Sequence, residues 1–259
     1  SVIQNSAEGG KIEIHAVSGQ SLIYRPALRQ AESEIAQKIH VLRRNSLAEE
    51  KRIDVPKALD WIRNQQDFNL SDGQMAAVQM ALESGISVIT GGPGVGKTTV
   101  LRSVLDVFVA KGLKCHLAAP TGRAAQRMSE SCGIDGQTIH RLLGFQPQGG
   151  FNFNASRPLE GDVFVLDEMS MIDLPLMRAF LAAAPMTARI LLVGDADQLP
   201  SVGPGSVLND LIGSEVIPVT RLCEVFRQGE GSRIIAASHD INKGLVPELV
   251  PAKDSDCFF

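Results

Sequence analysis

The clearest indication of this chain's architecture is the segment Ile86-Ser87-Val88-Ile89-Thr90-Gly91-Gly92-Pro93-Gly94-Val95-Gly96-Lys97-Thr98. Its first five residues form an apolar run typical of a buried strand, and residues 91–98 match the pattern G-x-x-x-x-G-K-[ST] ahead of a helical segment. Glycines at these positions let backbone N–H groups turn inward around phosphate oxygens, and the helix N-terminus adds partial positive charge. The alternative is a glycine-rich turn that binds no ligand. It does not explain why the strand, the glycines, the lysine and the threonine all stand at the positions that the motif requires.

This phosphate-binding loop (P-loop) predicts a site for a nucleoside triphosphate and Mg²⁺. Lys97 would neutralise the β and γ phosphates, and the Thr98 hydroxyl would be a ligand of Mg²⁺. The residues expected to contact the nucleotide are the loop and the two threonines after it: Gly92, Pro93, Gly94, Val95, Gly96, Lys97, Thr98 and Thr99.

A second apolar run, Val163–Leu166, ends in Asp167 and Glu168. Asp167 would hold Mg²⁺ through its coordination shell, and Glu168 would orient or deprotonate the attacking water. Acidic pairs end many strands, but beside a P-loop the pair indicates a catalytic role. The second acid favours hydrolysis of the nucleotide over transfer of its phosphate.

A third apolar run, Ile190–Val193, leads into Gly194-Asp195-Ala196-Asp197-Gln198. If this strand lies beside the P-loop strand, the amide of Gln198 can donate a hydrogen bond to the γ-phosphate without titrating. That bond would be lost on hydrolysis, so Gln198 would report the state of the nucleotide. The alternative is a structural amide that caps the turn at Leu199-Pro200.

Two further segments that follow strands carry basic side chains. Residues 117–125 open onto a helix with Arg123 and Arg127, and residues 138–144 begin with a helix cap and show a basic face. Both could contact nucleic-acid phosphates, although solvated helix faces remain the alternative. Aromatic residues for base stacking are few, and the candidates, which could equally be loop anchors, are Phe145, Phe151 and Phe153.

The order of apolar runs and helical segments from residue 67 to 243 predicts an α/β domain with a parallel sheet flanked by helices. The expected strands are Ile86–Thr90, Cys115–Ala119, Val163–Leu166, Ile190–Val193 and Val216–Val219. Residues 144–158 are expected to form an exposed loop or hairpin. Residues 1–66 are expected to form a small accessory module, a strand pair plus an amphipathic helix over 26–44, and residues 244–259 the start of a linker. Ligands of such sheets bind beyond the carboxyl ends of the strands.

Bulk composition narrows the class of protein. The chain has 259 residues, 44% of them hydrophobic and 21% charged, as in an ordinary globular core. A net charge of −4 excludes a basic coat over the whole surface, so any nucleic-acid contact must be local. The four cysteines are widely separated, which disfavours zinc sites and disulfides. Without a signal-peptide pattern or an apolar run of about 20 residues, a cytoplasmic setting without a membrane partner is expected.

Together these motifs resemble the motor of a superfamily 1 helicase, specifically its RecD-like branch, over residues 70–228. The specific matches are residues 119–125, 138–144 and 194–205. The segment Phe68–Gln74 looks like the family's Q motif, in which Gln74 would read the adenine edge. Arg227 stands where the family has an arginine that reaches the γ-phosphate. By the same resemblance, Thr121, Arg123 and His140 would face single-stranded DNA.

The resemblance implies a RecA-like fold, ATP and Mg²⁺ as cofactors, and 5′→3′ movement on single-stranded DNA with duplex unwinding. Some members of the family sit in exonuclease complexes. The family builds its ATP site between two RecA-like domains, and this chain ends at Phe259, before a second domain. We therefore expect a fragment of a longer helicase that binds Mg·ATP and hydrolyses it slowly. Two other functions stay open: a P-loop ATPase that acts as a switch or loader on protein partners, and a scaffold that uses ATP only for stability.

Overall fold

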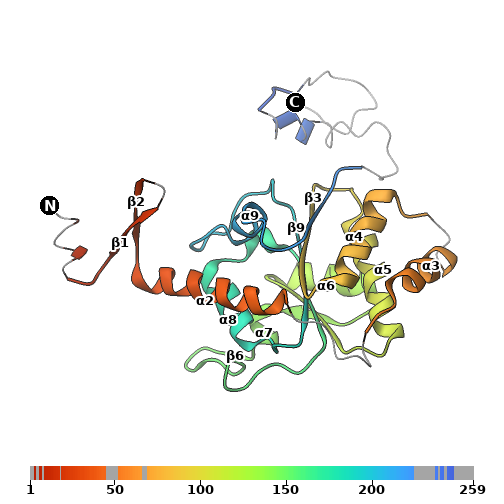
Figure 1. Ribbon diagram of the computed structural model, residues 1–259, viewed down its shortest axis with the longest axis horizontal. Coiled ribbons are helices and arrows are strands. Elements are labelled where there is room, and N and C mark those ends of the chain that lie inside the picture. The colour runs from red at the N-terminus through yellow and green to blue at the C-terminus, as the bar shows by residue number, and fades with distance from the viewer. Residues whose placement is uncertain are drawn as a thin grey trace.

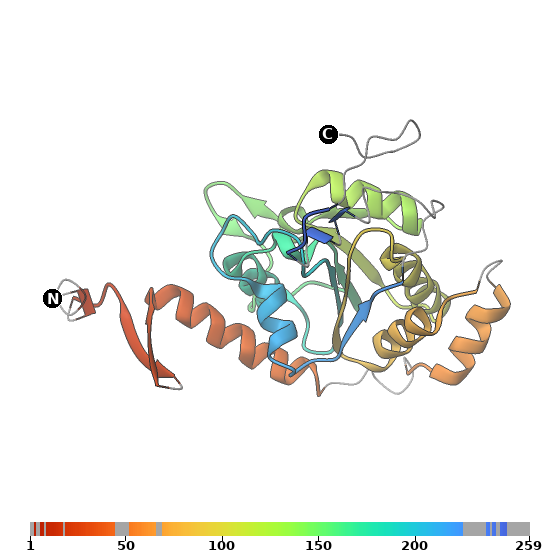
Figure 2. The same ribbon diagram turned by 90° about the horizontal axis from the view of Figure 1, so that it is seen from above.

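The computed structural model describes residues 3, 6–7, 9–17, 19–44, 52–65, 69–224, 237–238, 240–241 and 244–247 (Figures 1 and 2). In this part of the chain six strands form one parallel sheet in the order β10-β3-β9-β8-β4-β5. Their bounds are β3 Ile86–Gly91, β4 Cys115–Ala119, β5 Gly136–Thr138, β8 Val163–Leu166, β9 Arg189–Gly194 and β10 Val219–Leu222. The expected α/β class with a parallel, helix-flanked sheet is confirmed.

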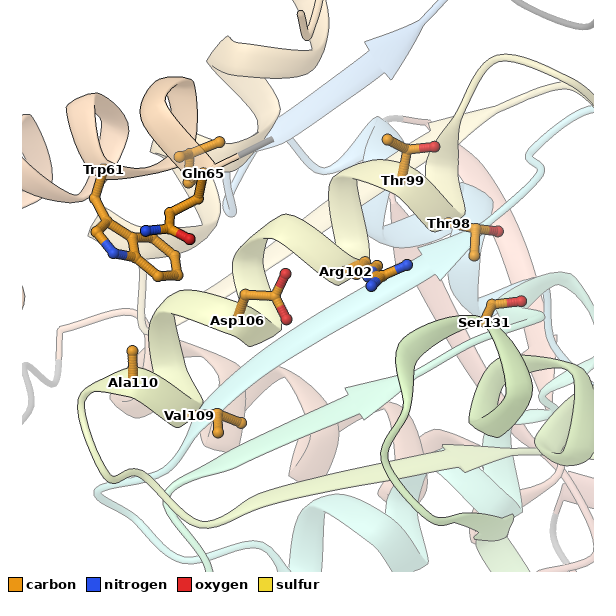
Figure 3. A pocket seen from close by; sticks show the side chains of 10 residues that line it. Trp61, Gln65, Thr98, Thr99, Arg102, Asp106, Val109, Ala110 and Ser131 are labelled. Atoms are coloured by element: carbon orange, nitrogen blue, oxygen red, sulfur yellow. The ribbon is translucent and has the colours of Figure 1, made fainter. Parts of the chain in front are cut away.

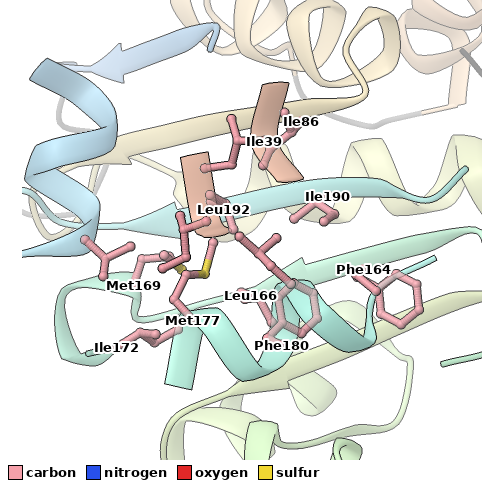
Figure 4. Close-up of a cluster of buried hydrophobic side chains, with 14 of the residues drawn as sticks. Ile39, Ile86, Phe164, Leu166, Met169, Ile172, Met177, Phe180, Ile190 and Leu192 are labelled. Carbon is pink, nitrogen blue, oxygen red and sulfur yellow. The ribbon is translucent and has the colours of Figure 1, made fainter. Parts of the chain in front are cut away.

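Helices cover both faces of this sheet. They are α2 Pro26–Leu42, α3 Val55–Gln65, α4 Asp72–Glu83, α5 Lys97–Ala110, α6 Gly122–Cys132, α7 Ile139–Leu142, α8 Leu174–Ala183 and α9 Val207–Gly213, with a 3-10 turn, η2, at Met169–Met171. Successive strand residues point to opposite faces, so Phe164 and Leu166 pack with α2, α7, α8 and α9 (Figure 4). Val163 and Val165 pack with α3, α4, α5 and α6 instead. Burial on both faces explains why these strands are continuous apolar runs.

The last strand of the sheet begins later in the sequence than its apolar pattern predicts. The expected strand was Val216–Val219, whereas β10 spans Val219–Leu222. Pro218 has no N–H to donate to the ladder, and only its carbonyl pairs, accepting from the Val88 N–H at 2.9 Å. The strand therefore starts after the proline. The edge strand β5 was not expected, because its three residues include a glycine and form no apolar run.

The N-terminal residues form the expected strand pair and helix. The antiparallel hairpin of β1 (Glu13–Val17) and β2 (Gln20–Tyr24) lies at one end of the molecule, away from the sheet (Figure 1). Helix α2 packs against α8, where the Arg178 guanidinium pairs with Glu34 and the Lys38 Nζ donates to the Ala184 carbonyl at 2.7 Å. Apolar residues of α2 belong to the same core as the sheet. The domain boundaries at residues 66 and 243 stay predictions.

Residues 144–158 contain the expected hairpin, formed by β6 (Phe145–Gln146) and β7 (Gly150–Phe151). It follows α7 and lies beyond the end of β5. Among the described residues, no helix is long and apolar enough to cross a membrane.

Candidate active site

The P-loop joins β3, which lies between β10 and β9 in the sheet, to the start of α5. Gly94 and Gly96 have φ angles of 81° and 82°, in the left-handed region that favours glycine. A side chain at Gly91 would put its Cβ 2.5 Å from the Leu222 carbonyl oxygen, so glycine lets β10 approach the loop. Helix α5 begins at Lys97 with backbone N–H groups that no side chain caps, which leaves them available to phosphate oxygens.

Lys97 lies over the loop that precedes it. Its Nζ donates to the carbonyl oxygens of Gly91 and Gly92, the latter at 2.8 Å. Burial lowers the pKa of Lys97, and the nearby carboxylates of Asp195, Asp167 and Glu168 act in the opposite direction. The site therefore holds a partly buried cation among three acids, an arrangement suited to a bound phosphate and a divalent cation together.

Asp167 and Glu168 follow β8 at the same edge of the sheet. The Asp167 N–H donates to the Ala118 carbonyl at 3.0 Å, and its Oδ1 accepts from the Glu168 N–H at 2.8 Å. Burial raises the pKa of the Asp167 carboxyl. Glu168 has φ 54° and ψ 44°, a left-handed conformation that costs a non-glycine residue about 1–2 kcal/mol. This reversal turns the chain from the strand into η2.

Gln198 lies near the P-loop because β9 pairs with β3, with Gly194 opposite Thr90. The strand order confirms that the glutamine-bearing strand lies beside the P-loop strand. The Ser170 hydroxyl donates to Gln198 Oε1 at 3.3 Å, and Gln198 Nε2 donates to Asp195 Oδ2 at 3.3 Å. These two side-chain bonds do not go to the Leu199-Pro200 turn, which argues against the turn-capping alternative.

A cavity of about 310 Å³ brings these groups together. Its lining includes Pro93, Gly94, Lys97, Thr98, Asp167, Glu168 and Gln198. One face of α6 completes it with Ala124, Arg127, Met128 and Ser131. We expected Arg127 on a nucleic-acid surface. The helical spacing of these four positions was the signal that could have placed Arg127 at the nucleotide cavity instead.

A larger cavity of about 700 Å³ adjoins the first along the flank of α5 (Figure 3). The two cavities share Thr98 and Ser131, and Thr99 lines only the larger one. The larger cavity runs from these residues to Trp61 on α3. Thr99, expected to contact the nucleotide, therefore lines the larger cavity and not the one that holds Lys97 and Asp167.

Gln74, in the first turn of α4, contacts the backbone of the P-loop. It is buried and forms a capping box with Ser71, whose N–H donates to Gln74 Oε1 at 3.1 Å. Its Nε2 donates to the Val95 carbonyl at 3.3 Å. The side chain does not line the phosphate cavity, and its role at the adenine edge stays a prediction. Phe68 and Arg227 lie outside the described residues.

The expected DNA-facing residues lie beyond β4 and β5, at the same edge of the sheet. Thr121 caps α6 by accepting from the Ala124 N–H at 3.3 Å, and Arg123 is exposed in the first turn of that helix. His140 is exposed and packs against the rings of Phe145 and Phe151 at centroid distances of 5.5 and 5.8 Å. None of the three lines the phosphate cavity.

Phe153 behaves as a loop anchor. It packs against the core, and the Arg157 guanidinium lies 5.2 Å from its ring centroid. Phe145, in contrast, is 49% exposed. Of the three possible stacking residues, it is therefore the one whose ring is most accessible to a base.

The acids at the cavity fit a magnesium ion. Thr98 supplies a hydroxyl and Asp167 a carboxylate, and Mg²⁺ typically takes one or two such ligands together with substrate phosphates and water. Within the described ranges, no cluster of three His, Cys, Asp or Glu side chains forms a metal site, and such a cluster is not needed for this ion.

Asp167→Asn is expected to stabilise the nucleotide-free protein while removing Mg²⁺-dependent nucleotide binding. Because burial raises the pKa of Asp167, its ionised form destabilises the fold at neutral pH, and that cost disappears as pH falls below the folded-state pKa. A gain of about 1 kcal/mol in the free energy of unfolding would raise Tm by roughly 2–4 °C at pH 7. Thermal unfolding checks this, because the gain of Asp167→Asn should be present at pH 7 and absent in acid.

The exposed Asp135→Asn is the matched control and should show no gain at either pH. An Asp167→Asn protein that is less stable than wild type at pH 7 would contradict the prediction.

Comparisons with known proteins show the family to which the chain belongs. Residues 69–257 match the family model described as "AAA domain". The chain is 38% identical over 233 residues to the ATP-dependent RecD2 DNA helicase of Deinococcus radiodurans, covering 90% of this chain and 32% of that protein. It is 35% identical over 210 residues to the RecBCD enzyme subunit RecD of Mycobacterium tuberculosis, covering 71% of this chain and 35% of the relative. The chain thus spans about a third of the length of these curated relatives.

Among solved structures, the Pif1 helicase of Candida albicans superposes with a TM-score of 0.54 at 25% identity, covering 70% of this chain and 45% of that one. Its similarity supports the helicase-type α/β fold described above. With its P-loop, its acidic pair and its glutamine at one cavity, the chain belongs to the AAA domain family and is similar to the RecD-type helicases.

Proposed function

We propose that this chain is the ATP-binding motor domain of a RecD-like DNA helicase. Its parent protein would couple ATP hydrolysis to 5′→3′ movement on single-stranded DNA and to duplex unwinding. The observation that supports this best is the convergence of Lys97, Thr98, Asp167, Glu168 and Gln198 on one cavity.

Each group has a distinct role in the proposed reaction. The loop N–H groups and Lys97 would bind the phosphates, and Thr98 and Asp167 would hold Mg²⁺, which would neutralise charge on the phosphates. Glu168 accepts a hydrogen bond from the attacking water and orients it. Gln198 contacts the γ-phosphate and loses that contact on hydrolysis.

The chain alone is proposed to bind Mg·ATP and turn it over slowly. In the proposed motor, a second RecA-like domain of the parent protein completes the ATP site, and arginines at the γ-phosphate contribute about 10³–10⁵ in turnover in related phosphoryl-transfer sites. Arg227 is proposed as one such arginine. Because one relative is a RecBCD subunit, exonuclease-complex subunits are proposed as partners of the parent protein.

Single-stranded DNA binding tests the motor against its alternative. With a non-hydrolysable ATP analogue, labelled oligo-dT should bind with an affinity that falls steeply between about 50 and about 200 mM salt. Arg123→Ala should weaken binding by a similar factor on every sequence and reduce the salt slope by about 1. Fluorescence anisotropy measures both, with Arg29→Ala on α2 as the control.

The alternative is a P-loop switch that acts on protein partners. One observation favours it: Leu199 and Val202, directly after Gln198, are 87% and 109% exposed and offer an apolar contact whose position can depend on nucleotide. If oligo-dT shows no salt-sensitive binding with or without the ATP analogue, the switch replaces the motor as the proposed function.

A further inference from the structure

We propose that Ser170 is a positioning residue that fixes the side-chain amide of Gln198 for contact with the terminal phosphate. The inference rests on the proposed function and deepens it, because it names the group that sets the geometry of the nucleotide-sensing glutamine.

Close packing first brings Ser170 opposite Gln198. The left-handed Glu168 turns the chain into η2, which contains Ser170. At the end of β9, a Cβ on Gly194 would lie 3.0 Å from both the backbone nitrogen and the Cβ of Met169, so the glycine lets strand and turn approach closely. Ser170 is only 8% exposed, which leaves its hydroxyl few partners besides Gln198.

Hydrogen-bond chemistry then fixes which way the amide faces. A carboxylate only accepts, so the Gln198 atom beside Asp195 Oδ2 has to be Nε2, at 3.3 Å. Oε1 must then face Ser170, whose hydroxyl donates to it at 3.3 Å. Nε2 carries two hydrogens and donates one to Asp195. In the described part of the chain, its second hydrogen stays available in the cavity that Gln198 shares with Lys97 and Glu168.

The Asp195 end of this network is held firmly. Asp195 is 4% exposed, and its Oδ1 accepts from the Asp197 N–H at 3.0 Å. The Ala196 N–H donates to Thr90 Oγ1 at 3.1 Å, which ties the segment to the P-loop strand. The Ser170 hydroxyl is the second anchor of the amide. Without it, the amide can rotate about its terminal bond, and ordering it on a phosphate costs side-chain entropy.

A purely structural serine makes a different prediction. A hydroxyl that only satisfies a buried polar group would change stability on removal and would affect ADP and ATP binding alike. A positioning serine instead changes the preference for the triphosphate, because only the triphosphate carries the group that Gln198 contacts.

The test compares affinities of the 259-residue chain for Mg·ADP and for a non-hydrolysable Mg·ATP analogue. Ser170→Ala should lower the preference for the triphosphate by about 3- to 10-fold, the effect of one hydrogen bond, and leave ADP affinity unchanged. Ser170→Thr, which keeps the hydroxyl, should restore the preference. Ser214→Ala removes a serine hydroxyl that bonds the Leu211 carbonyl on α9 and should change neither affinity.

Combining Ser170→Ala with Gln198→Ala makes the test specific. If Ser170 acts through the glutamine, adding Ser170→Ala to Gln198→Ala has no further effect on the preference. An unchanged preference in Ser170→Ala, or an equal loss in both backgrounds, overturns the proposal. A wild-type chain that binds no Mg·ATP analogue would contradict the proposed function itself. A wild-type chain that binds the analogue, together with an unchanged preference in Ser170→Ala, would contradict only the role of Ser170.

A spectroscopic measurement reads the same bond without nucleotide. In a chain labelled with ¹⁵N-glutamine, the side-chain amide signal missing from Gln198→Ala identifies Gln198. In Ser170→Ala this signal should move toward the position of a free glutamine amide, and in Ser170→Thr it should stay near its wild-type position. An unmoved signal in Ser170→Ala overturns the proposal.

Discussion

Glu168→Gln is expected to lower the rate of ATP hydrolysis by about 10²–10⁴, the usual contribution of a general base. Glutamine has the same size as glutamate and can occupy the same backbone position, so Mg·ATP should bind with unchanged affinity. The amide cannot accept the proton of the attacking water. Glu168 lines the cavity together with Lys97 and Thr98, which places it within reach of a bound phosphate.

Single-turnover hydrolysis of γ-labelled ATP, with protein in excess, measures the effect even where turnover is slow. Glu215→Gln is the matched control, because Glu215 is the other described non-glycine residue with a φ of 54° and it is exposed. A Glu168→Gln chain that hydrolyses ATP at the wild-type rate would remove Glu168 from the mechanism.

Lys97→Met is expected to weaken triphosphate binding by about 10- to 100-fold, the effect of losing a charge-assisted hydrogen bond. Methionine fills much of the same volume but cannot donate to a phosphate oxygen. Stability should change little, because the lost bonds to Gly91 and Gly92 are offset by the removal of a charge whose burial is unfavourable.

Titration with a fluorescent ATP analogue gives the affinities, and thermal unfolding checks that the variant is folded. Lys111→Met, at the other end of the same helix, controls for the loss of one positive charge. Equal affinities of Lys97→Met and wild type would mean that the loop does not bind phosphate in the proposed way.

Local sequence was enough to predict the elements that carry the site. The run Ile86–Thr90 and the loop after it correspond closely to β3, the P-loop and the start of α5. Val163–Leu166 was predicted with its observed bounds. Such predictions succeed because strand, tight loop and helix start depend on neighbouring residues: apolar runs, glycines with positive φ and a helix that begins at the lysine.

Side-chain roles were harder to predict from the same residues. The segment containing Gln74 was recognised by its resemblance to a motif, but its capping box and its bond to the Val95 carbonyl depend on how α4 packs behind the loop. Arg127 was assigned to a nucleic-acid surface, because a basic residue on a helix does not by itself indicate which cavity its face lines. Ser170 could not be assigned a role from the sequence, because its hydrogen-bond partner Gln198 lies 28 residues further along the chain.

Local patterns are sufficient to assign the chain to its class: a parallel α/β domain with a P-loop, an acidic pair and a glutamine, each at the end of a buried strand. The position of β9 between β3 and β8, which brings the three groups to one cavity, is seen only in the folded chain. Strands that are buried on both faces all have the same appearance in the sequence, that of an apolar run. Their order is fixed by long-range packing and crossover geometry, which local periodicity does not encode.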